Sequence, residues 1–169
     1  MIDFSLLDPQ FSSLAQQLIA NCAKRGVRMV PYFGLRTPLE QAKIWRQSRA
    51  GSEISNAITG FRNEGCDFLA DCLEKAGPCN GPWATNALPG FSTHNYGWAM
   101  DCYWVDSETT QVHWSGEGYN VYQEEAKLLG LYQAFLDPTK DIGHVQLVPP
   151  TYNFGTNAEV DAKMKAKFG

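Results

Sequence analysis

The segment Ser92–Asp101 constrains the fold most, because a glycine separates two side chains that can bind a metal. Alternation from Trp98 to Val105 predicts a buried strand, and Asp101 lies inside it. His94 precedes Asp101 by an odd number of positions, so it cannot share a strand face with that carboxylate. We therefore expect the chain to bend at Gly97 and His94 to return from a loop towards Asp101.

A second histidine, His144, follows Asp141 at a short spacing far downstream. Residues 144–148 predict a short strand that ends at two prolines. We expect His144 to project from a strand that neighbours Asp101. Asp141 should then lie on the loop that leads into this strand, with Gly143 absorbing the turn.

Two imidazoles and one carboxylate form a normal ligand set for a catalytic zinc ion, which keeps its fourth position open for water. The set here is His94, Asp101 and His144. Asp141 would supply the nearby proton-transfer group that such a site needs. Taken singly, each residue has an ordinary alternative: a structural histidine, or a buried aspartate satisfied by hydrogen bonds.

The composition narrows the class of protein. The chain has 169 residues, of which 44% are hydrophobic and 19% charged, which is typical of one globular domain. A net charge of -4 gives no electrostatic reason to expect nucleic acid as a partner. No apolar run is long enough to span a membrane, and the N-terminus lacks the basic and apolar regions of a secretory signal.

The chain has five cysteines, an odd number that argues against a complete disulfide framework. Cys22 and Cys102 are expected to be reduced thiols that pack as small apolar groups. Cys66, Cys72 and Cys79 cluster, and one bridge among them is left open.

The pattern of helices and strands predicts an α+β fold: a single domain over residues 1–169, with a small antiparallel sheet flanked by helices and the zinc site in a cleft. Residues 50–90 are rich in Gly, Asn, Ser and Pro, and we interpret them as a loop-rich insertion with a short helix over 64–75. The other expected elements are helices over 10–25, 37–48, 119–129 and 157–167 and a strand over 27–33. Asp8 is the expected N-cap of the first helix, and Thr37 is the expected N-cap of the second, with Glu40 as its capping-box partner.

The pattern Ser92-x-His94-x-x-Gly97-x-Ala99-x-Asp101, followed by Asp141-x-x-His144, closely resembles the zinc peptidases that act on peptidoglycan peptides. This family contains D-alanyl-D-alanine carboxypeptidases and dipeptidases, and the L-alanyl-D-glutamate endopeptidases of phage endolysins. The resemblance runs over most of the chain, and residues 34–41 are similar to the family's Gly-x-Arg-Ser segment.

The resemblance implies that His94, Asp101 and His144 hold Zn2+ and that Asp141 is the general base. It also implies that Arg36 stabilises charge, by binding a substrate carboxylate or the developing oxyanion, and that Ser92 contacts the substrate backbone. A surface arginine paired with an acid and an ordinary turn serine are the alternatives.

Asp141 occupies a place where many carboxypeptidase members carry glutamate, and aspartate there is more similar to the endolysin branch. The expected function is therefore cleavage of the L-alanyl-D-glutamate bond of the cell-wall stem peptide, by a monomeric phage endolysin held in the host cytoplasm until lysis. The alternatives are a D,D-carboxypeptidase or D-Ala-D-Ala dipeptidase on the same scaffold, and a non-catalytic wall-binding module. No nucleic acid or membrane insertion is expected.

Overall fold

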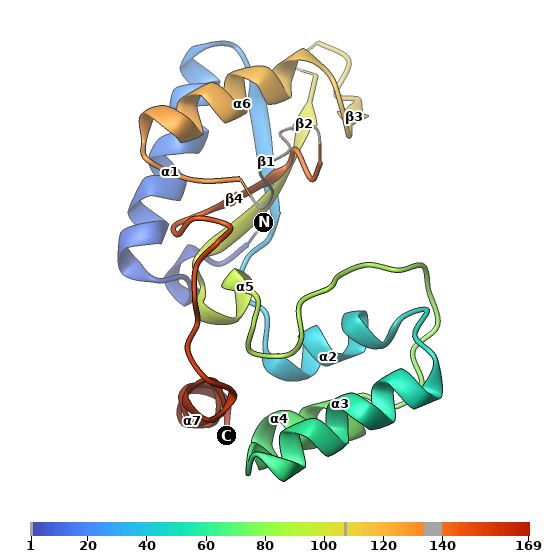
Figure 1. Cartoon of the computed structure of the whole chain (residues 1–169). Helices are drawn as coiled ribbons and strands as arrows, with labels where there is room; N and C mark the ends of the chain where they lie inside the picture. The colour runs from blue at the N-terminus through green and yellow to red at the C-terminus, as the bar shows by residue number, and fades with distance from the viewer. Residues whose placement is uncertain (1, 107, 134–139) are drawn as a thin grey trace. The chain divides into compact units, whose positions relative to one another are not determined.

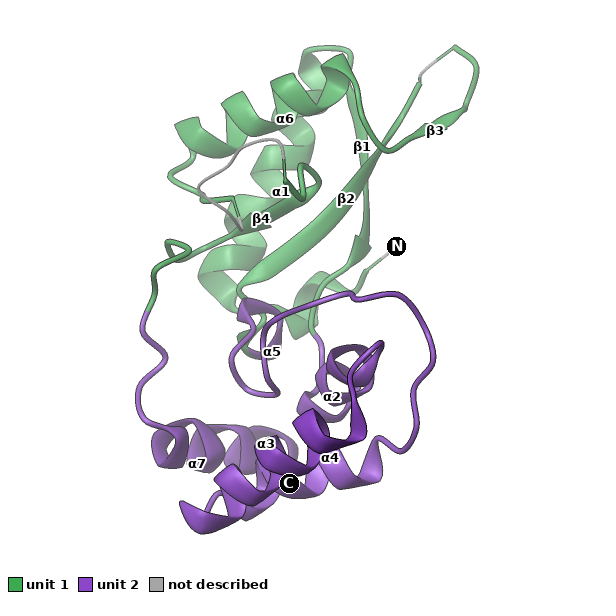
Figure 2. Cartoon of the chain, turned by 45° about the vertical axis from the view of Figure 1, so that its right-hand side comes forward, with its two compact units in different colours: residues 1–35, 96–152 green, residues 36–95, 153–169 purple. Residues whose placement is uncertain are grey.

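The computed structural model describes residues 2–106, 108–133 and 140–169. The chain divides into two compact units, coloured separately in Figure 2. The sheet unit comprises Met1–Leu35 and Tyr96–Tyr152, and the helical unit comprises Arg36–Asn95 and Asn153–Gly169. Within the described ranges, no helix has both the length and the apolar character needed to cross a bilayer.

The sheet unit is built around one central strand, β2 (Ala99–Val105). β1 (Arg28–Phe33) pairs with one edge of β2, and β4 (His144–Gln146) and β3 (Val112–His113) pair with successive parts of the other edge. Every pairing is antiparallel. A short 3-10 turn, η1 (Phe4–Leu6), precedes the first long helix. The expected α+β fold with a small antiparallel sheet is confirmed.

Two helices, α1 (Pro9–Lys24) and α6 (Glu117–Leu128), pack against each other and against the sheet (Figure 1). α1 begins as its sequence predicts, because the Asp8 carboxylate accepts hydrogen bonds from two backbone amides of the first turn. The buried core between helices and sheet includes Phe11, Met100, Tyr122 and Val145. Since Met100 and Val145 point to the helices, their strand neighbours point to the opposite face of the sheet.

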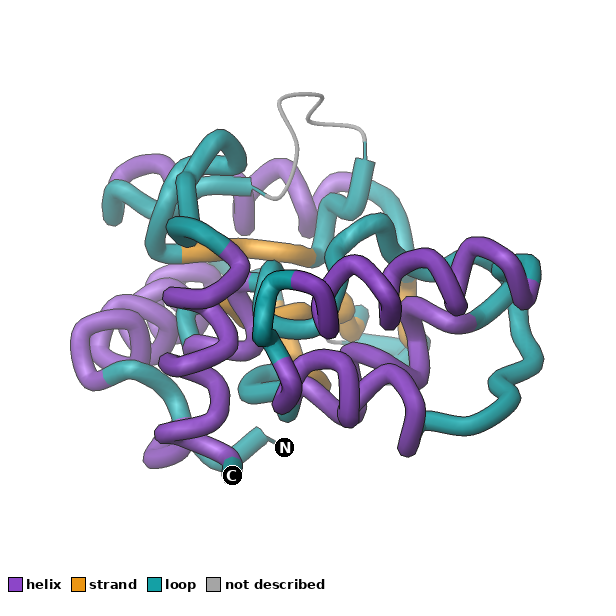
Figure 3. The backbone as a smooth tube through the Cα atoms, turned by 60° about the horizontal axis from the view of Figure 1, so that its bottom comes forward, coloured by secondary structure: helices purple, strands orange, loops and turns teal. Residues whose placement is uncertain are grey.

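The regular elements described in the helical unit are all helices, which Figure 3 colours apart from the strands. They are α2 (Pro38–Arg46), α3 (Gly51–Asn63), α4 (Asp67–Lys75), α7 (Asn157–Phe168) and most of the short α5 (Thr93–Tyr96). The loop-rich interpretation of residues 50–90 is wrong over α3. Poor helix formers such as Gly and Ser obscured this helix, although Ile54, Ile58 and Phe61 have the spacing of one apolar helix face. Tertiary packing of that stripe outweighs the weak local propensity.

The segment between α4 and residue 93 is held by buried polar side chains rather than by regular structure. The fully buried Gln41 donates to the carbonyl of Ala87 at 2.7 Å. The Arg49 guanidinium stacks between the rings of Trp45 and Trp83 and donates to the carbonyl of Thr85. These bonds fix the route by which the chain approaches His94.

All five cysteines are free thiols, so the bridge left open among Cys66, Cys72 and Cys79 is not formed. Cys79 is partly exposed, whereas the other four are buried.

Candidate metal centre

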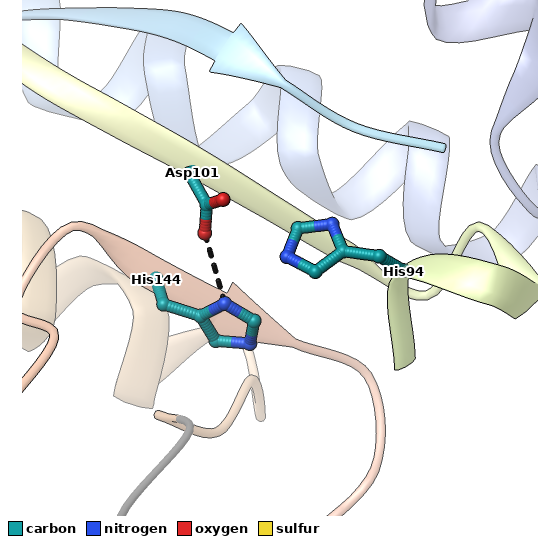
Figure 4. Close-up of side chains that lie close together, drawn as sticks. All are labelled: His94, Asp101 and His144. Carbon is teal, nitrogen blue, oxygen red and sulfur yellow. Dashed lines mark hydrogen bonds and ion pairs between the residues drawn. The ribbon is translucent and has the colours of Figure 1, made fainter. Parts of the chain in front are cut away.

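Strand register brings the second histidine directly opposite the aspartate. In the β2–β4 pair, Asp101 faces His144, as the sequence predicts. The His144 Nδ1 atom lies 2.9 Å from the Asp101 Oδ1 atom (Figure 4). Both side chains project from the face of the sheet that points away from α1 and α6, because their immediate strand neighbours, Met100, Cys102 and Val145, point into the core.

His94 reaches this group from α5 (Thr93–Tyr96), a single helical turn directly before β2. The sequence predicted that His94 would lie on a loop, and the structure instead places it in this helical turn. The expected bend at Gly97 is confirmed by its φ of +77°. A Cβ atom on Gly97 would lie 3.0 Å from the Asp8 backbone nitrogen, which in turn donates to the Gly97 carbonyl. The bend therefore needs glycine both for its conformation and for close backbone approach.

His94, Asp101 and His144 each present one ligand atom, and these atoms lie within 4.8 Å of one another. In Figure 4 the His94 ring points towards the other two side chains. Tetrahedral zinc with ligands at roughly 2.0–2.2 Å places neighbouring ligand atoms about 3.4 Å apart, so small side-chain rotations suffice to close the group on an ion. Neutral imidazole and carboxylate also match the preference of zinc for nitrogen and oxygen donors.

The charges near Asp101 and His144 favour the binding of a cation on their face of the sheet. Burial acts to lower the pKa of His144, but hydrogen bonding to Asp101, the charges of Asp101 and Asp141, and a hydrogen bond to Gln146 together raise it above its usual value. Burial, with the same two carboxylate charges, raises the pKa of Tyr32 on β1 to about 12. Asp141 therefore lies within electrostatic reach of the ligand group.

Asp141 lies on the loop before β4, as expected, and its side chain is exposed. Its backbone carbonyl accepts a hydrogen bond of 3.0 Å from the amide of His144. The expected turn at Gly143 is present, because Ile142 and Gly143 form the turn that this hydrogen bond closes, but the positive φ, +50°, belongs to Asp141, a residue type that tolerates this conformation. Gly143 is instead needed because a Cβ atom there would collide with the carbonyl oxygen of Cys102.

The two residues predicted to contact substrate, Arg36 and Ser92, both lie beside the turn that carries His94. The backbone amide of Arg36 donates to the His94 carbonyl at 3.1 Å. The guanidinium of Arg36 donates to the Gln41 side chain at 2.9 Å, and so its partner there is a neutral amide. The Ser92 carbonyl accepts from the amide of Asn95 in the turn that begins α5.

Three buried polar residues support this region, and the sequence assigned none of them a definite role. Asn95, fully buried, accepts from the Gly90 amide and donates to the Arg36 carbonyl. Gln41 joins Arg36 to a distant loop carbonyl. Gln146 contacts His144 directly. An amide side chain has no motif of its own, so only the tertiary contacts reveal these roles.

Comparison with known families identifies the group to which this arrangement belongs. Residues 5–154 match the profile of the family described as VanY: D-alanyl-D-alanine carboxypeptidase. The chain belongs to the VanY family. The matched range includes the three candidate ligands and Asp141. No curated protein matches the chain.

Solved VanY structures resemble the chain at low sequence identity. One is a mutant of the vancomycin resistance D,D-pentapeptidase VanY from a VanB-type resistance cassette in complex with Zn(II), with 16% identity and a TM-score of 0.49. That alignment covers 96% of this chain and 84% of the other. The second is VanYB in complex with D-alanine-D-alanine, with 16% identity, a TM-score of 0.44, and coverage of 95% and 81%.

Proposed function

We propose that this VanY-family protein is a zinc-dependent peptidase that hydrolyses a peptide bond in the stem peptide of bacterial peptidoglycan. The observation that carries the proposal is the approach of three ligand atoms, from His94, Asp101 and His144, to within 4.8 Å of one another. Three protein ligands leave one tetrahedral position for the reacting molecule, which is the arrangement of catalytic rather than structural zinc sites.

Zinc bound to these ligands supplies Lewis acidity, which makes water an effective nucleophile near neutral pH. Asp141 accepts the proton of the attacking water and later delivers a proton to the leaving amine. Its anchoring supports this role, because the hydrogen bond between its carbonyl and the His144 amide ties its loop to the first residue of β4. Its exposure allows substrate to reach the carboxylate.

Arg36 binds a carboxylate of the substrate or the oxyanion that develops during attack. Its hydrogen bond to the neutral amide of Gln41 helps to orient the guanidinium. Ser92 lies at the start of the turn that carries His94, and we assign its polar groups to the substrate backbone.

The scissile bond that we propose first is L-alanyl-D-glutamate, as in phage endolysins, which act on the wall after accumulating in the host cytoplasm. The support is Asp141, an aspartate where many carboxypeptidases of the family carry glutamate. The second candidate is the D-alanyl-D-alanine bond, which is favoured by the description of the family that matches the chain. Mass spectrometry of digested muropeptides separates them: a new amino terminus on D-glutamate supports the first, and release of free D-alanine supports the second.

The assignment of Asp141 is tested with Asp141→Asn, which keeps the shape of the side chain and tolerates the positive φ. Zinc content should stay at the wild-type level, while turnover falls about 100- to 10,000-fold because proton transfer is lost. Lys140→Ala, at the preceding exposed residue, is the matched control and should keep full turnover.

Undiminished turnover in Asp141→Asn would remove this residue from its role. A wild-type protein that binds zinc and the wall but produces no new peptide termini would instead support a non-catalytic binding module. Wild-type protein without zinc affinity would contradict the ligand assignment itself.

A further inference from the structure

The side chain of Gln146 is buried on the same strand as His144 and faces the same side of the sheet. It is 5% exposed, as is His144. Its backbone is held from two sides: it pairs with Ala99 in β2, and its amide and carbonyl both bond to Tyr132, at 2.7 and 2.8 Å. Such a residue has little freedom to move, so the contacts of its side chain are set by the sheet.

The orientation of the Gln146 amide follows from its two partners. One end lies 2.7 Å from the backbone carbonyl of Val148, which can only accept a hydrogen bond. That end must therefore be the NH2 group. The other end, the Oε1 oxygen, then lies 2.9 Å from the Nε2 atom of His144 and can only accept.

The same logic continues into the imidazole ring. Because Oε1 accepts, Nε2 of His144 carries a proton and has no lone pair to offer a metal. Nδ1 donates to the Asp101 carboxylate in this structure, and it is the ring nitrogen that can exchange its proton for a metal ion. Nδ1 is the atom that lies 2.9 Å from Asp101 and faces the ligand group. We propose that Gln146 is a positioning residue that selects the Nε2–H tautomer of His144 and so presents Nδ1 to the metal. This inference rests on the metal assignment under the proposed function.

Each group in this series of contacts fixes the orientation of the next one. The Val148 carbonyl orients the Gln146 amide, the amide oxygen orients the His144 ring, and the ring supplies the metal ligand. Partners that fix the tautomer and plane of a histidine ligand contribute about 10- to 100-fold to metal affinity. A loss of this size is the expected effect of removing the amide acceptor.

The tautomer can be observed in the wild-type protein without any variant. The chain has three histidines, so long-range proton–nitrogen NMR spectra of the zinc-loaded protein are simple to assign. We expect His144 to show a protonated Nε2 and a zinc-shifted Nδ1. A zinc-bound Nε2 would overturn the proposal, whatever happens in the variants.

Variants then test whether Gln146 is the cause. Gln146→Met removes the acceptor at similar size, and zinc affinity measured by competition with a chromophoric chelator should fall about 10- to 100-fold. Gln146→Glu retains an acceptor for Nε2–H and should recover most of that affinity. Asp161→Leu is the control, because Asp161, in α7, is another buried polar residue whose side chain bonds to a backbone group, the Leu69 amide, at 2.8 Å.

Zinc affinity in Asp161→Leu should equal that of the wild type. Equal losses in Asp161→Leu and Gln146→Met would assign the effect to general loss of packing and overturn the proposal. So would unchanged affinity in Gln146→Met, or a loss in Gln146→Glu as large as in Gln146→Met. Failure of the wild type to bind zinc would contradict the ligand assignment and is distinguishable from all three.

Discussion

Gly143 lies between the proposed base and the second histidine ligand, and its replacement by alanine tests how tightly the sheet positions the site. An alanine Cβ atom at this position would fall closer than 3.0 Å to the Cys102 carbonyl oxygen, a separation that real Cβ atoms essentially never show. The colliding atom belongs to the backbone of β2, and the carbonyl of Gly143 accepts from the Cys102 amide at 2.9 Å. The strain therefore falls on the strand pair that sets Asp101 opposite His144.

The size of the effect can be worked out from this contact. To reach ordinary van der Waals separation, the two backbones must move apart by about 1 Å. Overpacking of this kind costs about 1–3 kcal/mol, and weakening the adjacent hydrogen bond costs about 1 kcal/mol more. For a chain of this length, a loss of about 3 kcal/mol lowers the melting temperature by roughly 6–12 °C. A displacement near 1 Å at a catalytic group costs about 100-fold in rate.

Thermal unfolding followed by circular dichroism, together with turnover on muropeptides, measures both quantities in Gly143→Ala. Gly60→Ala is the control, because Gly60 is in α3 and a Cβ atom there meets nothing within 4 Å. Alanine in a helix is favoured over glycine by about 0.5–1 kcal/mol, so this variant should be slightly more stable and fully active. A Gly143→Ala protein with wild-type melting temperature and turnover would refute the argument that Gly143 is required for close approach.

Two further predictions concern the thiols and a buried amide. At pH 8 iodoacetamide should modify Cys79 rapidly in the native protein and all five cysteines after unfolding, because burial raises the pKa of Cys22 and Cys72 to about 11 and also raises that of Cys66. Mass spectrometry that finds rapid native modification of a buried thiol would contradict this. Asn95→Ala should lower the free energy of unfolding by about 2–4 kcal/mol, because it leaves the Gly90 amide and the Arg36 carbonyl without the bonds that Asn95 makes to them. Urea titration against Asn56→Ala, an exposed helical asparagine expected to change stability by less than about 0.5 kcal/mol, measures that loss.

The sequence predicted those parts of the fold that depend on local chemistry. Asp8 caps α1, and Thr37 and Glu40 form the capping box that begins α2, because caps are determined by residues a few positions apart. The bend at Gly97 and the position of His144 beside Asp101 were also predictable, since strand alternation decides which side chains share a face. α3 was missed because its stability comes from packing of an apolar stripe and not from its composition.

The same distinction between local sequence and tertiary packing applies to the residues of the site. Metal ligands are recognisable in sequence because few side-chain types can hold zinc and their spacing is limited by the strands that carry them. The groups that hold those ligands in place are not limited in this way: any acceptor at the position of Gln146 could select the tautomer of His144, and any small polar group at Asn95 could bridge Gly90 to Arg36. Their identity is decided by the separation of atoms across the sheet and between loops, which is a property of the tertiary structure. A substitution at Gln146 can therefore leave every residue of the family pattern intact and still weaken the metal centre, because the pattern specifies the ligands but not the tautomer in which they are presented.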